Sequence, residues 1–258
     1  MKLEKRTVLI TGGTSGIGLE LAKQLCQRGN VVIVTGRDQA KLETIRRLLP
    51  GIHTFKSDVS DPAAIAVLYD EVIAQFPTLD TLVNNAGIMR NLDLNRDRDL
   101  VDVTREIEIN LSGPVRMVQQ FLPHLKTQEH ALIINVSSGL AFIPLPISPV
   151  CSASKAAIHS FTLSLRMQLA GSCVTVVEVA PPGTETPLFR GEFEDELKGQ
   201  RGMDPQVLVR RAIAGIEAGK LEIRPGVANV LKAMSRIAPQ FMLNQLTKLA
   251  KPKAPLAV

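Results

Sequence analysis

The stretch TVLITGGTSGIG, residues 7–18, decides the fold. Its first part has the composition of a short buried strand, and the residues after the glycines have helical periodicity. A strand, a glycine-rich turn and a helix in this order place backbone N–H groups at a helix N-terminus, where they attract phosphate. Glycine is needed because a side chain would block a pyrophosphate or the close strand–helix contact. The stretch therefore predicts a dinucleotide site, with a tight loop that binds nothing as the alternative.

The rest of the chain alternates apolar strands with amphipathic helices. Strands are expected at 31–35, 52–56, 79–83, 131–136, 174–179 and 222–224, and helices at 19–28, 41–49, 63–76, 101–125, 151–169 and 237–249, with another opening at Pro205. This alternation predicts an α/β fold, a doubly wound (Rossmann) and mostly parallel sheet of about seven strands with helices on both faces. The helix at 101–125 is expected to kink or break at Pro114.

The chain has 258 residues without a Ser/Gly linker or a repeat, so residues 1–258 are predicted to form a single domain. A segment at about 188–220 is expected to cover the substrate, and residues 252–258 to form a loose tail. Hydrophobic residues make up 45% and aromatic residues only 3%, which suits a buried parallel sheet built from aliphatic side chains.

Charge and cysteine usage exclude several functional classes. The net charge is +5 without a long basic block, so no nucleic-acid partner is expected. The three cysteines, Cys26, Cys151 and Cys173, have no metal spacing and indicate a reducing compartment without a disulfide framework. No signal peptide or membrane-spanning run is recognisable, and the protein is expected to be cytoplasmic.

The end of the second strand is where a dinucleotide site selects its ribose. An acidic residue there binds a free 2′-hydroxyl, whereas an arginine accepts a 2′-phosphate. Gly36 and Arg37 favour the phosphate and hence NADP, with NAD as the less favoured cofactor. Asp38 either binds a hydroxyl or caps the following helix.

Polar residues follow the later strands as well. Asp58 comes at the end of the third strand, where open α/β sheets bind ligands. Ser138 follows the fifth strand, and Cys151 and Lys155 are four residues apart, so on a helix they point from the same face. A hydroxyl and an ammonium that converge on one pocket form a proton-transfer site. Asn110 is expected to bond a carbonyl freed at the kink or a trapped water.

These motifs occur in a fixed order that resembles the short-chain dehydrogenase/reductase family. They are Thr11-Gly12-x-x-x-Gly16-Ile17-Gly18, Asp58, Asn84-Asn85-Ala86-Gly87, Asn110, Ser138, Lys155 and Pro182-Gly183-x-x-Thr186. They cover residues 7 to about 188 and are specific as an ordered set. Shorter segments, GIMR after NNA and PHL followed by LAFIP, are similar to the DltE-like branch of the family. This branch implies no particular substrate.

The resemblance implies roles for the matching positions. Ser138 would bond the substrate oxygen, Lys155 the nicotinamide ribose, Asn110 a relay water, Asp58 would lie near the adenine and Thr186 would meet the nicotinamide amide. The resemblance also implies a homodimer or homotetramer built on the helices after the fourth and fifth strands. The dinucleotide would be held by Gly12, Thr14, Ser15, Gly16, Ile17, Gly18, Arg37, Asp58, Val59, Asn84, Ala86, Gly87, Lys155, Pro182, Gly183 and Thr186.

The chain departs from the family at Cys151, where the family has a tyrosine that protonates the carbonyl oxygen as hydride arrives. The only tyrosine, Tyr69, lies in an earlier helix. The ammonium of Lys155 is expected to lower the pKa of the thiol and make it partly thiolate, which cannot donate a proton. Loss of a positioned acid typically costs ~10²–10⁴-fold in rate.

Four interpretations of Cys151 follow from this departure. The chain is a substituted form of an oxidoreductase that naturally has tyrosine there, or a natural variant with weak or unusual reductase activity. It is otherwise a non-catalytic NADP(H)-binding sensor or scaffold. The last interpretation is that the thiol acts as a nucleophile and forms a covalent adduct. Such chemistry needs an orienting base, and His159 lies two helical turns beyond Cys151.

The substrate itself is not identified by the sequence. Apolar residues are expected to form the walls of its pocket, which indicates a hydrophobic carbonyl or secondary alcohol. Ordinary core packing is the alternative for some of them. They are Met89, Leu140, Phe142, Leu145, Ile147 and Phe189.

Overall fold

One seven-stranded parallel sheet organises the protein. The computed structural model describes residues 2–249, so the predicted tail at 252–258 lies outside the described residues. The strand order is β3-β2-β1-β4-β5-β6-β7, and every neighbouring pair is parallel. The predicted doubly wound α/β sheet is thereby confirmed. The strands are β1 (Thr7–Thr11), β2 (Val31–Gly36), β3 (His53–Lys56), β4 (Leu79–Asn84), β5 (Ala131–Val136), β6 (Val174–Val179) and β7 (Glu222–Ile223).

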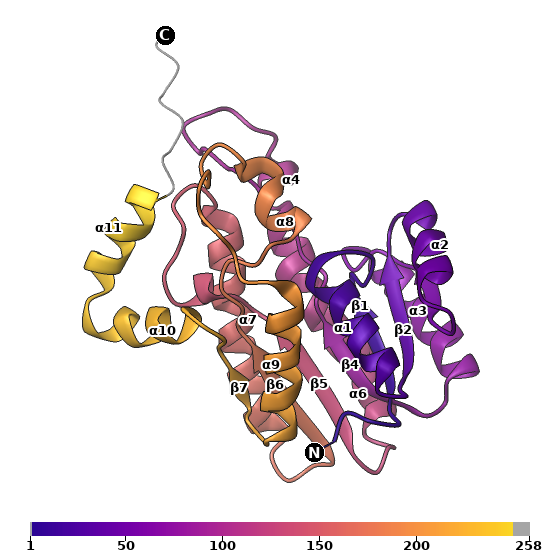
Figure 1. Cartoon of the computed structure of the whole chain (residues 1–258). Helices are drawn as coiled ribbons and strands as arrows, with labels where there is room; N and C mark the ends of the chain where they lie inside the picture. The colour runs from indigo at the N-terminus through magenta and orange to yellow at the C-terminus, as the bar shows by residue number, and fades with distance from the viewer. Residues whose placement is uncertain (1, 250–258) are drawn as a thin grey trace.

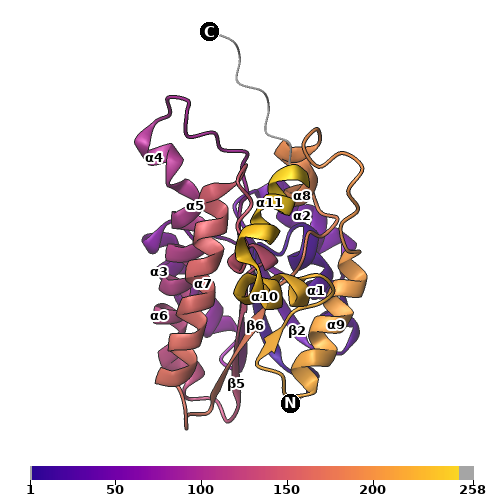
Figure 2. The ribbon, with the colours of Figure 1, turned by 90° about the vertical axis from the view of Figure 1, so that its left-hand side faces the viewer.

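Helices cover both faces of this sheet (Figures 1 and 2). They are α1 (Gly16–Gln27), α2 (Gln39–Leu48), α3 (Pro62–Gln75), α4 (Leu100–Val103), α5 (Arg105–Ile107), the π-helix η1 (Glu108–Ser112), α6 (Gly113–Leu125), the 3₁₀-helix η2 (Gly139–Ala141), α7 (Pro149–Gln168), α8 (Pro187–Arg190), the 3₁₀-helix η3 (Gly191–Phe193), α9 (Pro205–Glu217), α10 (Ala228–Ile237) and α11 (Pro239–Leu249).

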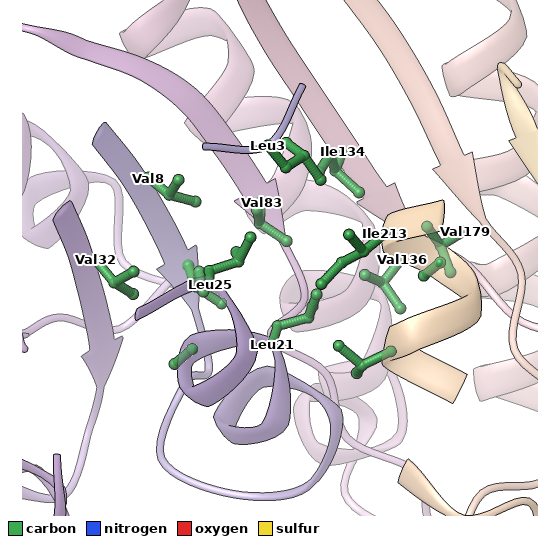
Figure 3. Packing of buried hydrophobic residues seen from close by; sticks show 14 of the residues in the cluster. Leu3, Val8, Leu21, Leu25, Val32, Val83, Ile134, Val136, Val179 and Ile213 are labelled. Carbon is green, nitrogen blue, oxygen red and sulfur yellow. The ribbon is translucent and has the colours of Figure 1, made fainter. Parts of the chain in front are cut away.

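Alternation along the strands divides the core into two layers. In β1, Val8 and Ile10 pack under α1, α2 and α9, whereas Leu9 points to the opposite layer. Figure 3 shows Leu21 and Leu25 of α1 packed with the strands, with α9 residues beside them. On the other face, α3, α6 and α7 pack around residues such as Phe121, which is fully buried. Both faces are covered, which explains why the strands are almost continuously apolar.

The order in which successive strands are added to the sheet reverses between β1 and β4. From β1 the order runs through β2 and β3 on one side, and through β4, β5, β6 and β7 on the other. In open parallel sheets, ligands bind beyond the carboxyl ends of the strands at this switch point. The turn after β1 and the ends of β4 and β5 are therefore placed side by side.

The single kinked helix predicted at 101–125 is wrong in detail. The structure divides this segment into α4, α5, η1 and α6, with Pro114 in the first turn of α6. Proline is tolerated in a first turn because the N–H it lacks has no partner within the helix there. The five-residue π-helix Glu108–Ser112 precedes it and contains Asn110. A π turn holds one residue more than an α turn, and such turns occur frequently at functional sites.

The C-terminal part also differs from the prediction. In the expected covering segment at about 188–220, residues between Leu188 and Met203 line the cavity. The helix α9, in the same segment, packs instead on the sheet through Val209, Ala212 and Ile213 and against α1. Its start at Pro205 agrees with the sequence, because Asp204 caps it by accepting from the N–H groups of Gln206 and Val207. The helix expected at 237–249 is present as α11, whereas α10, which precedes it, was not predicted. Both helices project from the body of the molecule (Figure 1).

Gly12 provides a test of the turn that follows β1. Its φ is +66°, and a Cβ there would lie 2.8 Å from the Ala86 Cα. We expect Gly12→Ala to lower the free energy of unfolding by about 3 kcal/mol, because backbone strain and a clash add together. Gly29, with φ +76° and no atom within 4 Å, is the matched control. Gly29→Ala is expected to cost about 1 kcal/mol, and equal losses in urea unfolding would contradict the close packing of Gly12 on Ala86.

Candidate active site

A cavity of about 940 Å³ lies beyond the carboxyl ends of the strands. Its wall includes the turn after β1 and the ends of β2 to β6, and it continues to α10 and α11. A pocket of this size accommodates a cofactor or a drug-sized ligand. Fourteen of the predicted dinucleotide residues line it: Gly12, Thr14, Ser15, Gly16, Ile17, Arg37, Asp58, Val59, Ala86, Gly87, Lys155, Pro182, Gly183 and Thr186.

The glycine turn and the segment after β6 meet at one end of the cavity. A Cβ on Gly16 would lie 3.2 Å from Cγ2 of Thr186, so the two segments approach to side-chain contact. Thr186 also caps α8 by accepting from the N–H of Phe189. Gly12 and Gly16 both line the cavity, and Gly16 is the first residue of α1. This arrangement fits the phosphates of a dinucleotide.

Two predicted dinucleotide residues, Gly18 and Asn84, lie behind the cavity wall. A Cβ on Gly18 would collide with the Gly12 carbonyl, so Gly18 allows α1 to approach the turn. The Asn84 amide donates to Oδ1 of Asn135 at 2.9 Å and ties β4 to β5. The residue that faces the cavity is Asn85, whose amide donates to the carbonyls of Thr11 and Gly12 at 3.0 and 3.1 Å.

At the ribose end of the cavity, Arg37 and Lys41 are basic, and Asp38 and Asp58 are acidic. Arg37 follows β2 with its side chain about half exposed, and its Nη1 lies 3.7 Å from Oδ2 of Asp58. Asp38 caps α2 by accepting from the N–H of Lys41 at 3.2 Å. Burial raises the pKa of Asp58, but hydrogen bonds from Ser60 and the charge of Arg37 outweigh it and hold that pKa below its usual value.

Ser138 and Lys155 converge beyond the end of β5. Ser138 caps η2, and its Oγ accepts from the N–H of Leu140 at 3.1 Å. Lys155 lies on α7, and its Nζ donates to the carbonyl of Val136 at 2.9 Å. Burial lowers the pKa of the Lys155 ammonium. A Cβ on Gly87 would lie 3.6 Å from this Nζ, so the end of β4 also reaches the same point.

Cys151 lines the cavity between these groups but is only 3% exposed. Burial raises the pKa of its thiol to about 11, although the nearby charge of Lys155 opposes this. The expectation of a partial thiolate is therefore wrong. Desolvation of the charged form outweighs the attraction of one neighbouring ammonium. The thiol is protonated at neutral pH.

Asn110 joins three segments of the site. Its Oδ1 accepts from the N–H of Ile88 at 2.8 Å, and its Nδ2 donates to the carbonyl of Ile88 at 2.9 Å. The same Nδ2 reaches Oγ of Ser154 at 3.1 Å and lies 3.8 Å from Sγ of Cys151. The expected bond to a carbonyl thus goes to the segment after β4 rather than to the helix that holds Asn110.

His159 and Tyr69 have partners outside the cavity and are not placed to exchange a proton with Cys151. Nδ1 of His159 lies 2.7 Å from Oε2 of Glu178, a buried carboxylate that also accepts from the hydroxyl of Ser137. Tyr69 packs edge-on against Phe121 in the core, with ring centroids 5.2 Å apart. Neither His159 nor Tyr69 is among the residues that line the cavity.

The far end of the cavity is apolar. Met89, Leu140, Leu145 and Phe189 line it as predicted. Ile147 packs instead into a small core with Phe193 and Leu197. The turn before α10, α10 and α11 also contribute to this wall, which the sequence did not predict. No helix was expected immediately before residue 237, so α10 was not predicted. The residues of this part that line the cavity are Val227, Val230, Leu231, Met242 and Leu246.

Phe142, also predicted in the wall, lies behind it and anchors α10. Nζ of Lys232, on α10, lies 5.2 Å from the centroid of the Phe142 ring. The same Nζ bonds both carboxylate oxygens of Glu222 on β7, at 2.5 and 2.6 Å. An ion pair and a cation–π contact therefore hold α10 against the edge of the sheet.

A family model described as short chain dehydrogenase matches residues 6–197, which include every element of the nucleotide end of the cavity. The chain belongs to the short-chain dehydrogenase/reductase family. It is similar to the uncharacterized oxidoreductase DltE of Bacillus subtilis (strain 168), with 44% identity over 224 residues that cover 86% of this chain and 89% of the relative. This likeness confirms the predicted DltE-like branch and an oxidoreductase.

Two solved structures of the family bind nicotinamide cofactors. A short chain dehydrogenase from Burkholderia cenocepacia J2315 in complex with NADP has a TM-score of 0.82 and 25% identity, over 95% of this chain and 99% of its own. A 3-ketoacyl-(acyl-carrier-protein) reductase from Brucella melitensis with NADH has a TM-score of 0.78 and 28% identity, over 88% and 100%. A nicotinamide cofactor is thus supported for the family site. Within residues 2–249, no helix is long and apolar enough to cross a bilayer.

The protonated state of Cys151 can be measured by alkylation. In a Cys26→Ser/Cys173→Ser variant, we expect iodoacetamide to modify Cys151 at pH 7.5 at least about 100-fold more slowly than after unfolding. Thiolate is the reactive form, and its fraction should rise with pH up to the pKa of about 11. Mass spectrometry of the Cys151 peptide follows the rate. A plateau reached below about pH 9 would show the thiolate that the sequence predicted.

Proposed function

We propose that this protein is an NADP(H)-dependent oxidoreductase that transfers hydride between the nicotinamide and a hydrophobic carbonyl or secondary alcohol. One observation carries the proposal: Ser138, Cys151 and Lys155 all line one cavity, between a glycine-rich polar end and an apolar end. A dinucleotide at the polar end and a substrate at the apolar end would meet at these three side chains. The family membership supports the reaction class.

The cofactor choice rests on the end of β2. Asp38 is engaged as a helix cap, which leaves Arg37 as the residue that faces the ribose position with an exposed guanidinium. A guanidinium suits a 2′-phosphate, whereas a free 2′-hydroxyl is usually bound by a carboxylate. NADP is therefore proposed over NAD. The dinucleotide would supply or accept the hydride when bound.

Proton transfer is the weak step in this chain. Ser138 would bond the substrate oxygen, and Lys155, held by the Val136 carbonyl, would bond the ribose. The family has a tyrosine at the position of Cys151, and a thiol is shorter than a phenol and a weaker donor. The pKa of about 11 keeps the Cys151 thiol protonated, but the short side chain does not extend as far as a tyrosine hydroxyl would. We infer that reductase activity is impaired, although the nucleotide end is complete.

A second function is favoured by the same observation. A complete nucleotide end beside a poor proton donor is also what a non-catalytic NADP(H)-binding sensor or scaffold would have. The two functions differ in one respect. Restoring the proton donor should restore turnover in an oxidoreductase and change nothing in a sensor.

The substitution Cys151→Tyr separates these functions. We expect it to raise NADPH oxidation with small hydrophobic ketones and aldehydes by about 100-fold or more, because a positioned general acid contributes ~10²–10⁴-fold. The control is Cys151→Phe, which has the ring without the hydroxyl and should give no gain. Tight NADPH binding by both variants, with no turnover on any carbonyl, would favour the sensor or scaffold.

The substitution Arg37→Ala tests the cofactor. Loss of the guanidinium is expected to weaken NADPH binding about 10-fold or more and to leave NADH binding nearly unchanged, because only NADPH carries the 2′-phosphate. Fluorescence titration of both nucleotides measures the effect, and Arg47→Ala, at an exposed arginine of α2 that does not line the cavity, is the matched control and should change neither affinity. An equal loss for the two nucleotides would refute the assignment of NADP.

Oligomeric state, cellular location and domain organisation are also part of the proposal. A cytoplasmic homodimer or homotetramer that packs through α6 and α7 stays a prediction, as does a single domain over residues 1–258. Exposed apolar side chains on these two helices support the contact between copies. They are Val115 at 37%, Leu163 at 41% and Met167 at 75% exposure.

A further inference from the structure

The positive charge of this chain is concentrated in its last 36 residues. Six of the 30 basic residues and none of the 25 acidic residues lie at 223–258, so the preceding part carries 24 basic residues against 25 acidic ones. The whole excess of +5 therefore comes from the segment that contains α10 and α11. A charge distribution this uneven is a physical property that a partner with the opposite charge would recognise.

The helix α10 is apolar on two sides. Ala228 is buried and Leu231 lines the cavity, so these residues mark the inner side. Val230, Ala233 and Ile237 follow the spacing i, i+3 and i+7, which places them on one face, and all three are exposed. Val230 is 53% and Ile237 76% exposed. Val230 also lines the cavity, whereas Ala233 and Ile237 do not, so the exposed apolar face extends beyond the pocket.

The helix α11 also has an exposed large apolar side chain. Met242 and Leu246 point to the cavity, whereas Phe241 is 57% exposed, with the exposed Lys248 seven residues further on the same face. Phe241 and Ile237 lie on either side of the turn that joins the helices. Figure 2 shows α10 and α11 across the front of the molecule, at an angle to each other.

Unpaired cations flank these apolar side chains. Among residues 2–249, no carboxylate forms an ion pair with Arg236 or Lys248, in contrast to Lys232, which is held by Glu222. Both unpaired residues are exposed. Lys251 and Lys253 follow shortly in the sequence and add two further positive charges. Apolar side chains flanked by lysine and arginine, with no acidic residue, are the pattern of a helix that lies on an anionic membrane surface.

We propose that α10 and α11 dock on the surface of a membrane that contains anionic lipids. Ile237 and Phe241 enter the headgroup region, and Arg236 and Lys248 contact the lipid phosphates. Val227 and Val230, which line the cavity and are 61% and 53% exposed, place its mouth beside this surface. An apolar molecule could then pass from the bilayer to the cavity without crossing bulk water. The docking itself does not rest on the proposed reductase activity.

Vesicle flotation tests the docking with the full chain. Vesicles of phosphatidylcholine alone are compared with vesicles in which about a third of the lipid is phosphatidylglycerol. We expect the protein to float with the anionic vesicles and not with the neutral ones, and salt at about 0.5 M to reduce the bound fraction, because screening weakens the attraction.

Two double variants locate the surface. Ile237→Ser/Phe241→Ser and Arg236→Ser/Lys248→Ser are each expected to lower the partition coefficient about 10-fold. The matched control is Leu100→Ser/Val101→Ser, which removes apolar side chains that are 82% and 80% exposed on α4 and should change nothing. Unchanged NADPH binding in all three variants would show that they are folded.

Three results would overturn the proposal. The protein fails to float with anionic vesicles, or the control variant loses binding as much as the variants of α10 and α11. The third is a change in sedimentation coefficient of Ile237→Ser/Phe241→Ser without vesicles, which would assign the surface to a contact between two copies of the chain.

Discussion

The amide of Asn110 is the interaction on which the candidate active site depends. It bonds both the N–H and the carbonyl of Ile88 and reaches the hydroxyl of Ser154, so it fixes the segment after β4 to α7. Ser154 in turn donates to the carbonyl of Cys151 at 2.7 Å. The π turn of η1 directs this amide inward, where it is fully buried. Buried polar networks of this kind hold one arrangement because any loosened member would lose its partners.

Burial decides the charge states inside this network. Cys151 and Lys155 are neighbours whose charged forms would attract each other, yet burial pushes the pKa of the thiol up and that of the ammonium down. Both shifts favour the neutral forms, since the cost of desolvating two charges exceeds the attraction between them. The site therefore lacks the thiolate that spacing alone would predict. It is suited to holding a substrate oxygen more than to protonating it.

The sequence predicts the features that depend on local pattern. Glycines after β1, Arg37 after β2 and Ser138 after β5 lie at strand ends, and parallel strands bring their carboxyl ends to one edge. What depends on packing could not be predicted. Asn84 points away from the cavity because its side chain is hydrogen-bonded to Asn135, which leaves Asn85 to face the cavity. Both residues are asparagine, so residue type alone could not tell which of them lines the site.

Two further differences have the same origin. The π turn cannot be recognised in a helical pattern because it adds one residue without changing composition. The helix α10 was not predicted, because the expected helix began only at residue 237, where α10 ends before Pro239. The pKa of Cys151 is set by neighbours from several segments, so its sign follows only from the packed structure.

At the apolar end of the cavity, α10 is held more firmly than α11, because Lys232 anchors α10 to the sheet. Lifting α10 would break the ion pair with Glu222 and uncover Phe142. Within residues 2–249, no ion pair joins α11 to another element, and its inner side chains contribute mainly dispersion contacts. A bulky molecule that enters the cavity would therefore displace α11 about the Ala238 turn while α10 stays in place, so the entrance widens on one side only.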